Sequence, residues 1–295
     1  MNEKSVGPLV SVDWLRGHLA DPDLRLVHVS PDRSVYDEAH LPGAVYCDLH
    51  AELALRGTRP ETGDAEREWL VPTATQLTAT VRGWGVGPRD RVIFYDDIGQ
   101  NRQAIRGYWL LRYYRWPRER VHVVDGGLNA WRDRGGPVTD VIPPVRHAEP
   151  VPFDVADPSL MASFDEVRAW SVESAAGGPV RILDVRTPEE HRGEDVRARR
   201  AGHIPGAVNL PFTEFLREDG TFKSADEIRA LAERAVGGDL TQLRAAHCQG
   251  GVRAALAWFA LHELAGIEGV RNYAGSWEEW GNRTDCAVES APSRE

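Results

Sequence analysis

Short apolar runs alternate with amphipathic stretches along most of the chain. The runs are four to six residues long and are bounded by charged residues or glycine, and they occupy residues 24–29, 92–95, 121–124, 180–185, 245–248 and 270–273. Runs of this kind predict buried parallel strands. Helical periodicity predicts helices at 11–20, 104–113, 164–174, 225–236 and 252–264. The alternation predicts an α/β fold class, with mainly parallel sheets flanked by helices.

This pattern occurs twice, because motifs of the first half return in the same order in the second half. The sequence HLPGAV at 40–45 recurs as HIPGAV at 203–208, and LVHVSP at 26–31 resembles ILDVRTP at 182–188. An internal repeat that preserves the order of its motifs predicts two copies of one domain.

The two copies are predicted at residues 1–140 and 159–295, joined by a linker at 141–158. The linker contains five prolines and has no sustained period, which is typical of a semi-rigid connection. The length of 295 residues also fits two domains, since a domain usually takes about 100–200 residues.

The charge of the chain restricts its partners. It carries 35 Lys+Arg against 45 Asp+Glu, a net charge of −10, which argues against a nucleic acid or an anionic membrane as a partner. No apolar run approaches the roughly 20 residues that cross a bilayer. The first residues also lack the apolar core of a signal peptide, so we expect a cytoplasmic protein.

Three cysteines, Cys47, Cys248 and Cys286, are too few and too scattered for a disulfide framework. None of them forms a Cys-x-x-Cys pair, so we expect neither a metal site nor a dithiol redox site. In a reducing compartment a lone cysteine is either a small buried residue or a nucleophile, and its sequence context decides between the two.

The context of Cys248 is the most informative segment of the chain. Cys248 ends a predicted strand, two glycines follow, and a helix then begins. Glycines let the backbone turn tightly, so that several N–H groups can point at one spot, and the helix N-terminus adds partial positive charge. A sulfur there would be favoured as a thiolate, and the same pocket would suit an anionic sulfur donor. The alternative is a buried strand residue followed by an ordinary turn.

Several motifs taken together resemble one known family. They are the two repeated turns, the segment DVRTP from Asp184, the six-residue loop CQGGVR at 248–253, and the closing YAGSWEEW from Tyr273. The two copies resemble rhodanese domains, and nearly the whole chain is similar to tandem-domain sulfurtransferases of the thiosulfate or 3-mercaptopyruvate type.

The resemblance implies a catalytic Cys248 that alternates between thiol and persulfide. The donor would be a small anion, thiosulfate or 3-mercaptopyruvate, and the acceptor would be cyanide or a thiol; no cofactor is implied. The loop amides would hold the persulfide. The expected substrate-binding residues are Gln249, Gly250, Gly251, Val252, Arg253, Arg200 and Arg186.

The repeat also makes a prediction about the first copy. Aligning residues 92–99 with 244–251 places Asp96 opposite Cys248. A carboxylate cannot accept a sulfane sulfur, so the first copy is expected to be catalytically inactive.

The chain departs from the family's patterns at the places that would choose the donor. Its loop matches neither the CRKGVT of thiosulfate enzymes nor the CG(S/T)GVT of mercaptopyruvate enzymes, and Glu190 stands where mercaptopyruvate enzymes usually have arginine. Arg199 or Arg200 matches the position of a donor-binding arginine of the family, and Arg200 is the better candidate. Arg186 could instead pair with an acid of its own domain, so the donor stays open.

Two other functions compete with sulfur transfer. Cysteine-based phosphatases share this fold but need five residues between cysteine and arginine, whereas four separate Cys248 from Arg253. The other is a non-catalytic protein for sulfur relay or docking, against which the intact Cys248 loop argues.

Overall fold

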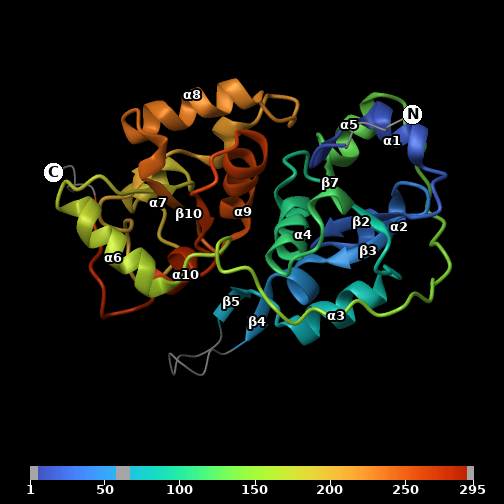
Figure 1. The fold of residues 1–295 in the computed structure, drawn as a ribbon, viewed down its shortest axis with the longest axis horizontal. Coiled ribbons are helices and arrows are strands. Elements are labelled where there is room, and N and C mark those ends of the chain that lie inside the picture. The colour runs from blue at the N-terminus through green and yellow to red at the C-terminus, as the bar shows by residue number, and fades with distance from the viewer. Residues whose placement is uncertain (1–5, 58–66, 291–295) are drawn as a thin grey trace. The chain divides into compact units, whose positions relative to one another are not determined.

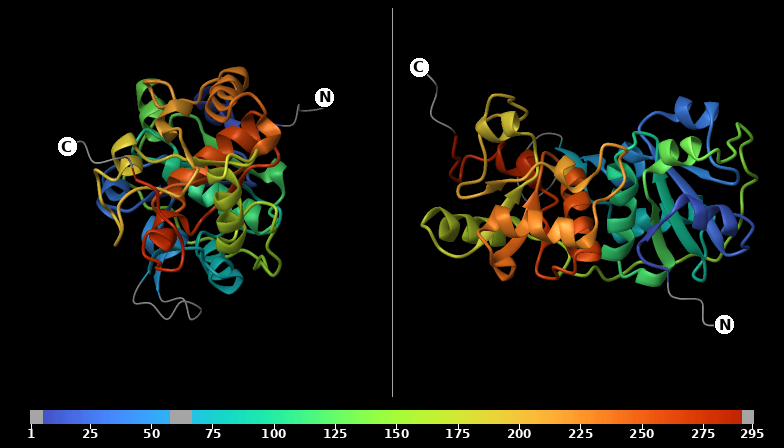
Figure 2. Two further views of the ribbon diagram at one scale, coloured as in Figure 1. Left: turned by 90° about the vertical axis from the view of Figure 1, so that its left-hand side faces the viewer. Right: turned by 90° about the horizontal axis from the view of Figure 1, so that it is seen from above.

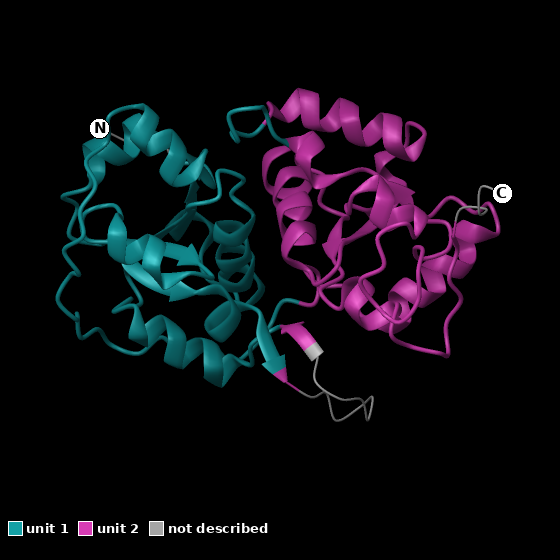
Figure 3. Ribbon diagram, turned by 180° about the vertical axis from the view of Figure 1, so that it is seen from behind, with its two compact units in different colours: residues 1–56, 71–157, 216–222 teal, residues 57–70, 158–215, 223–295 magenta. Residues whose placement is uncertain are grey.

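The structure, a computed structural model, describes residues 6–57 and 67–290. The chain divides into two compact units of similar architecture. Unit 1 contains residues 1–56, 71–157 and 216–222, and unit 2 contains 57–70, 158–215 and 223–295 (Figure 3). Residues 57–70 therefore belong to unit 2 although the residues on both sides of them in sequence belong to unit 1. Residues 216–222 belong to unit 1 although their sequence neighbours belong to unit 2.

Unit 1 is built on a five-stranded parallel sheet in the order β1-β7-β6-β2-β3 (Figure 1). Its strands are β1 (Leu9–Val10), β2 (Leu24–Ser30), β3 (Val45–Asp48), β6 (Arg91–Asp96) and β7 (Val121–Val124). Its helices are α1 (Val12–His18), α2 (Arg33–Glu38), α3 (Ala74–Gly83), α4 (Arg102–Tyr113) and α5 (Gly127–Asp133), with a π-helical turn at Leu49–Leu53 and a 3₁₀ turn at Arg118–Arg120.

Alternate side chains of β6 explain why helices cover both faces of this sheet (Figure 2). Ile93 and Tyr95 belong to one buried cluster with Leu15 of α1 and Trp131 of α5. Phe94 points the other way, where Gly107 of α4 leaves room for its ring. Successive residues of a strand face opposite sides, so an unbroken apolar strand has to be covered twice.

Unit 2 repeats the plan with a four-stranded parallel sheet in the order β11-β10-β8-β9. Its strands are β8 (Arg181–Asp184), β9 (Val208–Asn209), β10 (Leu243–His247) and β11 (Arg271–Asn272). Its helices are α6 (Phe164–Ala175), α7 (Pro188–Arg192), α8 (Ala225–Val236), α9 (Val252–Trp258) and α10 (Ser276–Trp280), with a π-helical stretch at Phe259–Leu264 and 3₁₀ turns at Phe212–Phe215 and Leu240–Gln242. The short strands β4 (Leu55–Gly57) and β5 (Arg67–Leu70) form a separate two-stranded sheet.

Local sequence signals set where several helices begin. Serine or threonine at the N-cap and glutamate or glutamine three residues later form reciprocal capping boxes at α3, α6, α7 and α8. In α7, Thr187 and Glu190 form this box, so Glu190 is held in place by its own helix. Glycines in the left-handed conformation end α7 and α8.

The predicted α/β class with mainly parallel sheets flanked by helices is confirmed. Several element boundaries differ from the prediction by one or more residues, and two of these differences involve the segment around Cys248. The helix expected over 252–264 changes from α-helical to π-helical spacing after Trp258, with main-chain bonds such as that from Ala265 to Ala260. The strand expected to include Cys248 ends at His247, because the Cys248 N–H donates to the Ser276 side chain instead of to a neighbouring strand.

The predicted linker forms neither helix nor strand at residues 141–157. It is held to unit 1 by Arg146, which donates to the Gly85 carbonyl at 3.2 Å, and by the backbone of Phe153, which donates to Thr78 at 3.2 Å. Among the described residues, no helix has the length and apolar character needed to cross a membrane.

Candidate active site

The loop between β10 and α9 presents a backbone N–H group to the sulfur of Cys248. The Cys248 side chain is free and only 1 % exposed. Its Sγ accepts a hydrogen bond from the Gly251 N–H at 3.1 Å. Gly251 has φ of +80°, and a Cβ there would lie 2.7 Å from the Ala274 carbonyl oxygen. The turn that brings this N–H to the sulfur therefore requires glycine.

Ser276 anchors the other side of the loop. Its hydroxyl accepts from the Cys248 N–H at 3.0 Å and donates to the Tyr273 carbonyl at 2.8 Å. The hydroxyl oxygen lies 3.9 Å from the Cys248 Sγ. The Trp277 N–H donates to the Cys248 carbonyl at 2.9 Å. Ser276 was not among the predicted site residues, although it lies inside the closing YAGSWEEW motif that could have pointed to it.

Arg253 is held beside the loop by an ion pair with Glu190. Its two terminal nitrogens donate to the two Glu190 oxygens at 2.6 and 2.8 Å, and both side chains are largely buried. Burial opposes the charge of each group, but the ion pair outweighs it. The pKa of Glu190 is therefore lowered, and the pKa of Arg253 is raised, with the nearby Cys248 sulfur also favouring the cation.

Arg197 also reaches this part of the site, although the sequence analysis did not select it. Its carbonyl accepts from the Gln249 side chain at 2.9 Å, and its guanidinium lies 3.4 Å from Glu190. The Arg197 side chain is 47 % exposed, whereas that of Arg253 is 12 % exposed. The sequence offered little to distinguish it, because the run 192–200 contains several arginines.

Arg186 and Arg200, both expected to contact the donor, are engaged within unit 2. Arg186 is buried and donates to both Asp184 oxygens, at 2.9 and 2.6 Å, and to the Gly202 carbonyl at 2.8 Å. Arg200 donates to the carbonyls of Trp280 and Cys286 at 2.6 and 2.7 Å. These contacts favour a structural role for the two guanidinium groups.

His247 precedes Cys248 but is unsuited to act as its base. The ring is fully buried, with Nε2 3.8 Å from Asp184 and Nδ1 3.4 Å from the Cys248 carbonyl oxygen. Burial lowers the pKa of His247 to about 4. The imidazole is therefore neutral at pH 7, and neither contact involves the Cys248 sulfur.

The first copy has a carboxylate at the equivalent position. In unit 1, His28 pairs with Tyr95, the residue before Asp96; in unit 2, Asp184 pairs with His247, the residue before Cys248. This register matches Asp96 with Cys248. The carboxylate of Asp96 accepts from the backbone of Gln103 at 3.1 Å, in the first turn of α4.

The other two cysteines, Cys47 and Cys286, have surroundings that raise the pKa of their thiols. Cys47 of β3 is fully buried, and burial raises the pKa of its thiol well above the ordinary value. Arg200 donates to the sulfur of Cys286 at 3.2 Å, yet burial still raises the pKa of Cys286. Both thiols are thus held in the protonated form at pH 7.

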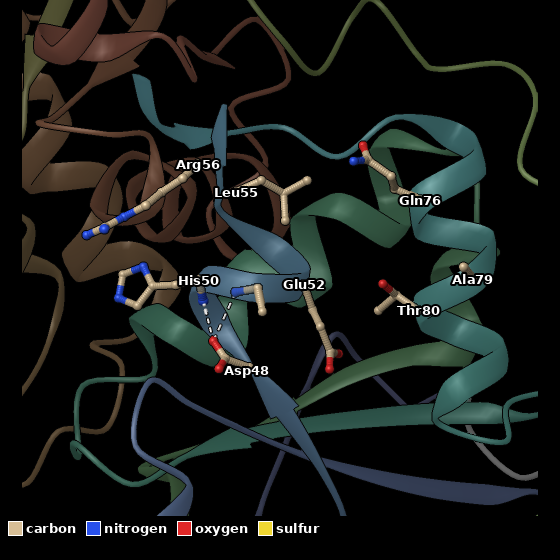
Figure 4. Close-up of a pocket in the computed structure, with 9 residues that line it drawn as sticks. Asp48, His50, Glu52, Leu55, Arg56, Gln76, Ala79 and Thr80 are labelled. Atoms are coloured by element: carbon tan, nitrogen blue, oxygen red, sulfur yellow. Dashed lines mark hydrogen bonds between the residues drawn. The ribbon is translucent and has the colours of Figure 1, made fainter. Parts of the chain in front are cut away.

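A pocket of about 690 Å³ lies in unit 1 between the π-helical turn and α3. Figure 4 shows Glu52 and Thr80 entering it from these two elements. The carboxylate of Glu52 accepts from the indole of Trp84 at 2.8 Å and also interacts with Cys47, and burial raises the pKa of Glu52. The residues lining this pocket include no cysteine.

Comparison with known proteins identifies the family. The model of the Rhodanese-like domain matches residues 11–134 and again 168–283. A Haloferax volcanii protein named "Putative thiosulfate sulfurtransferase" is 38 % identical over 95 % of this chain and 96 % of its own. The sulfur carrier protein TtuD of Thermus thermophilus is 34 % identical over 93 % of each chain.

A solved structure agrees with these relatives. SseA from Escherichia coli, a 3-mercaptopyruvate sulfurtransferase, matches with a TM-score of 0.75 and 25 % identity, covering 92 % of this chain and 99 % of its own. The chain belongs to the rhodanese-like family and contains two copies of its domain. Within that family, its relatives identify it as a sulfurtransferase.

Proposed function

We propose that this protein transfers a sulfane sulfur through a persulfide on Cys248. The donor is a small anion, thiosulfate or 3-mercaptopyruvate, and the acceptor is a thiophile such as cyanide or a thiol. The observation that carries the proposal is the hydrogen bond from the Gly251 N–H to the Cys248 Sγ. A backbone donor aimed at a sulfur in this turn favours the thiolate and the persulfide anion over neutral forms.

The reaction proceeds in two displacements. The Cys248 thiolate attacks the outer sulfur of the donor, so that a new S–S bond forms. The bond that held this sulfur in the donor breaks, which is the S–S bond of thiosulfate or the C–S bond of 3-mercaptopyruvate. Its electron pair leaves on sulfite or on the enolate of pyruvate, and the enolate then takes a proton from water. The acceptor next attacks the outer sulfur of the persulfide and carries it away as thiocyanate or a new persulfide. The Cys248 thiolate is regenerated, which predicts ping-pong kinetics.

Arg253 supplies a fixed positive charge beside the reacting sulfur. It is held by two hydrogen bonds to Glu190, so its position does not depend on the substrate. A preorganised charge stabilises the anionic persulfide without reorganisation during the reaction. Gln249, Gly250 and Val252 are expected to contribute to donor binding through the shape of the loop and through their backbone N–H groups.

A phosphatase activity fits these contacts less well. Phosphate-binding arginines use a planar pair of N–H groups to hold two oxygens, and both terminal nitrogens of Arg253 already bond Glu190.

We also propose that the first copy, at residues 1–140, is inactive, because Asp96 replaces the nucleophile.

Intact mass spectrometry tests the proposal directly. After incubation with thiosulfate or 3-mercaptopyruvate, the protein should gain the mass of one sulfur atom, and cyanide should remove it. Cys248→Ser should abolish the gain, whereas Cys47→Ser and Cys286→Ser should retain it. A gain that survives in Cys248→Ser would exclude this nucleophile, and Cys248-dependent hydrolysis of a phosphate ester without sulfur loading would favour the phosphatase. A stable persulfide that neither cyanide nor thiols discharge would favour a relay protein.

A further inference from the structure

Trp69 of β5 packs directly against the loop that carries Cys248. Gly250, the middle of that loop, is buried. A Cβ built on Gly250 would lie 2.2 Å from Cγ, 2.4 Å from Cδ1 and 2.7 Å from Cβ of Trp69. These distances leave no room for a side chain, so the indole occupies the space that any other residue at position 250 would need. Both residues belong to unit 2.

The backbone of Trp69 is held in a conformation that bulky residues rarely adopt. Its φ is +68°, in the left-handed region that costs a non-glycine residue about 1–3 kcal/mol. Ser276, which accepts the hydrogen bond from the Cys248 N–H, has φ of +51°. Two of the four non-glycine residues with positive φ in the described ranges therefore contact the Cys248 loop. Conformations of this kind cluster at functional sites.

We propose that Trp69 is a specificity-determining residue for the acceptor in the sulfur-transfer reaction, an inference that rests on the proposed function. Cys248 is almost fully covered, so an acceptor has to pass the side chains around the loop. A rigid indole beside Gly250 narrows that access and presents apolar surface. Small thiophiles such as cyanide reach the persulfide past the indole. Thiols with bulky charged substituents reach it more slowly, because the indole restricts the space and offers no polar contact.

The acceptor half-reaction provides the test. The protein is first loaded with sulfur from thiosulfate, and discharge of the persulfide is then timed with cyanide and with glutathione. In Trp69→Ala, the rate with glutathione relative to cyanide should rise by about tenfold, the scale on which one pocket contact discriminates. Trp69→Phe should keep the original ratio, because an aromatic wall remains.

Trp170→Ala is the matched control. Trp170 of α6 is a partly exposed tryptophan of the same unit, and its ring lies under the guanidinium of Arg271 in β11. Its loss therefore removes an indole away from the loop. A ratio that rises equally in Trp170→Ala, or that stays constant in Trp69→Ala, would overturn the inference while leaving the proposed function intact. If the unchanged protein never gains sulfur, the proposed function fails and the inference fails with it.

A double-mutant cycle examines the contact itself, independently of turnover. Gly250→Ala should lower the thermal midpoint of unfolding, because its methyl group meets the indole. In a Trp69→Gly background that loss should shrink, since Cβ, Cγ and Cδ1 are removed and glycine accepts the positive φ. Equal losses in the two backgrounds would show that Trp69 does not pack on the loop and would overturn the inference.

Discussion

The loops that follow β6 in unit 1 and β10 in unit 2 use one backbone plan for two different chemical groups. Each follows a buried strand, and each enters its helix through a left-handed residue, Asn101 in the first and Gly251 in the second. Asp96 directs its carboxylate to N–H groups in the first turn of α4. Cys248 presents its sulfur to the N–H of Gly251.

The lengths of the two loops show why the difference matters. The left-handed residue that directly precedes the helix follows Asp96 after five positions and Cys248 after three; Gly99, three positions after Asp96, is also left-handed but does not begin the helix. The shorter turn brings a backbone donor within hydrogen-bonding distance of a sulfur, whereas the longer one lets an internal carboxylate use the helix N-terminus. A single residue exchange therefore does not convert one loop into the other.

Exchange of the two side chains is the strongest test of this comparison. Cys248→Asp should abolish sulfur loading completely, because a carboxylate offers no thiolate. Asp96→Cys in that background should not restore it, because the backbone groups that donate to residue 96 come from Gln103 and Ala104 of the helix, and the second loop instead donates from the residue that precedes its helix. Intact mass after incubation with thiosulfate measures both outcomes. Any sulfur gained on residue 96 would show that loop length is unimportant and would contradict the comparison.

Gly251→Ala tests the turn itself. The new Cβ would lie 2.7 Å from the Ala274 carbonyl oxygen at φ of +80°. We expect a loss of about 1–3 kcal/mol in the free energy of unfolding from the backbone conformation alone. Displacement of the N–H that bonds the sulfur should slow loading by about 100-fold.

Gly237→Ala is the control for this strain, because Gly237 also has positive φ but has open space around it. Gly237→Ala should lower the free energy of unfolding, but the folded fraction of this variant should gain sulfur on Cys248 at the rate of the parent protein. Urea unfolding and single-turnover mass measurements separate the two effects. Equal loading rates in the two variants would remove Gly251 from the site.

The sequence predicted β2, β6, β7, β8, β10, β11 and the turn after Cys248, because their signals are local, whereas β1, β3 and β9 of the two main sheets were not among the runs predicted as strands. Apolar runs, glycines after Cys248 and a following helix lie within a few positions of one another. The contact between Glu190 and Arg253 spans 63 positions, and the contact between Trp69 and Gly250 spans more. No spacing rule connects such segments, so these partners became visible only in the folded chain. Arg200 follows the same pattern, because the carbonyls of Trp280 and Cys286 that it binds lie 80 and 86 positions away. Arg186 instead pairs with Asp184, two positions away, which is the alternative that the sequence had left open.

Glu190→Gln tests the charged pair that Glu190 and Arg253 form beside Cys248. The amide keeps the size of the side chain but removes its charge, so Arg253 loses the partner that holds it. We expect kcat/KM to fall by about tenfold, because a charge-assisted bond is worth about 1.5–3 kcal/mol. Arg253→Lys should fall similarly, since lysine cannot make the paired contact. Glu189→Gln is the control, because Glu189 is an exposed neighbour on the same helix. A loss as large in Glu189→Gln would mean that general charge, and not the pair, controls the rate.

The last expected effect acts on stability and not on sulfur loading, and it concerns the proton on Asp96. Burial raises the pKa of Asp96 to about 7, from an ordinary value near 3.8. Between these two values the folded chain binds a proton at Asp96 that the unfolded chain has released. The free energy of unfolding from this group therefore falls as pH rises through that range and levels off above about pH 7.

Asp96→Asn should remove this dependence while keeping an oxygen that accepts from Gln103. Urea unfolding of the full chain at about pH 5 and about pH 8 gives the comparison, and the difference between variant and parent isolates Asp96 from other titrating groups such as His247. The parent should lose stability relative to the variant on going to the higher pH. A difference that is constant with pH would show that Asp96 is ionised throughout. In that case the carboxylate of the first loop would carry its charge beside the N–H group of Gln103, and the two loops would differ in their length and in the group that accepts the backbone hydrogen bond.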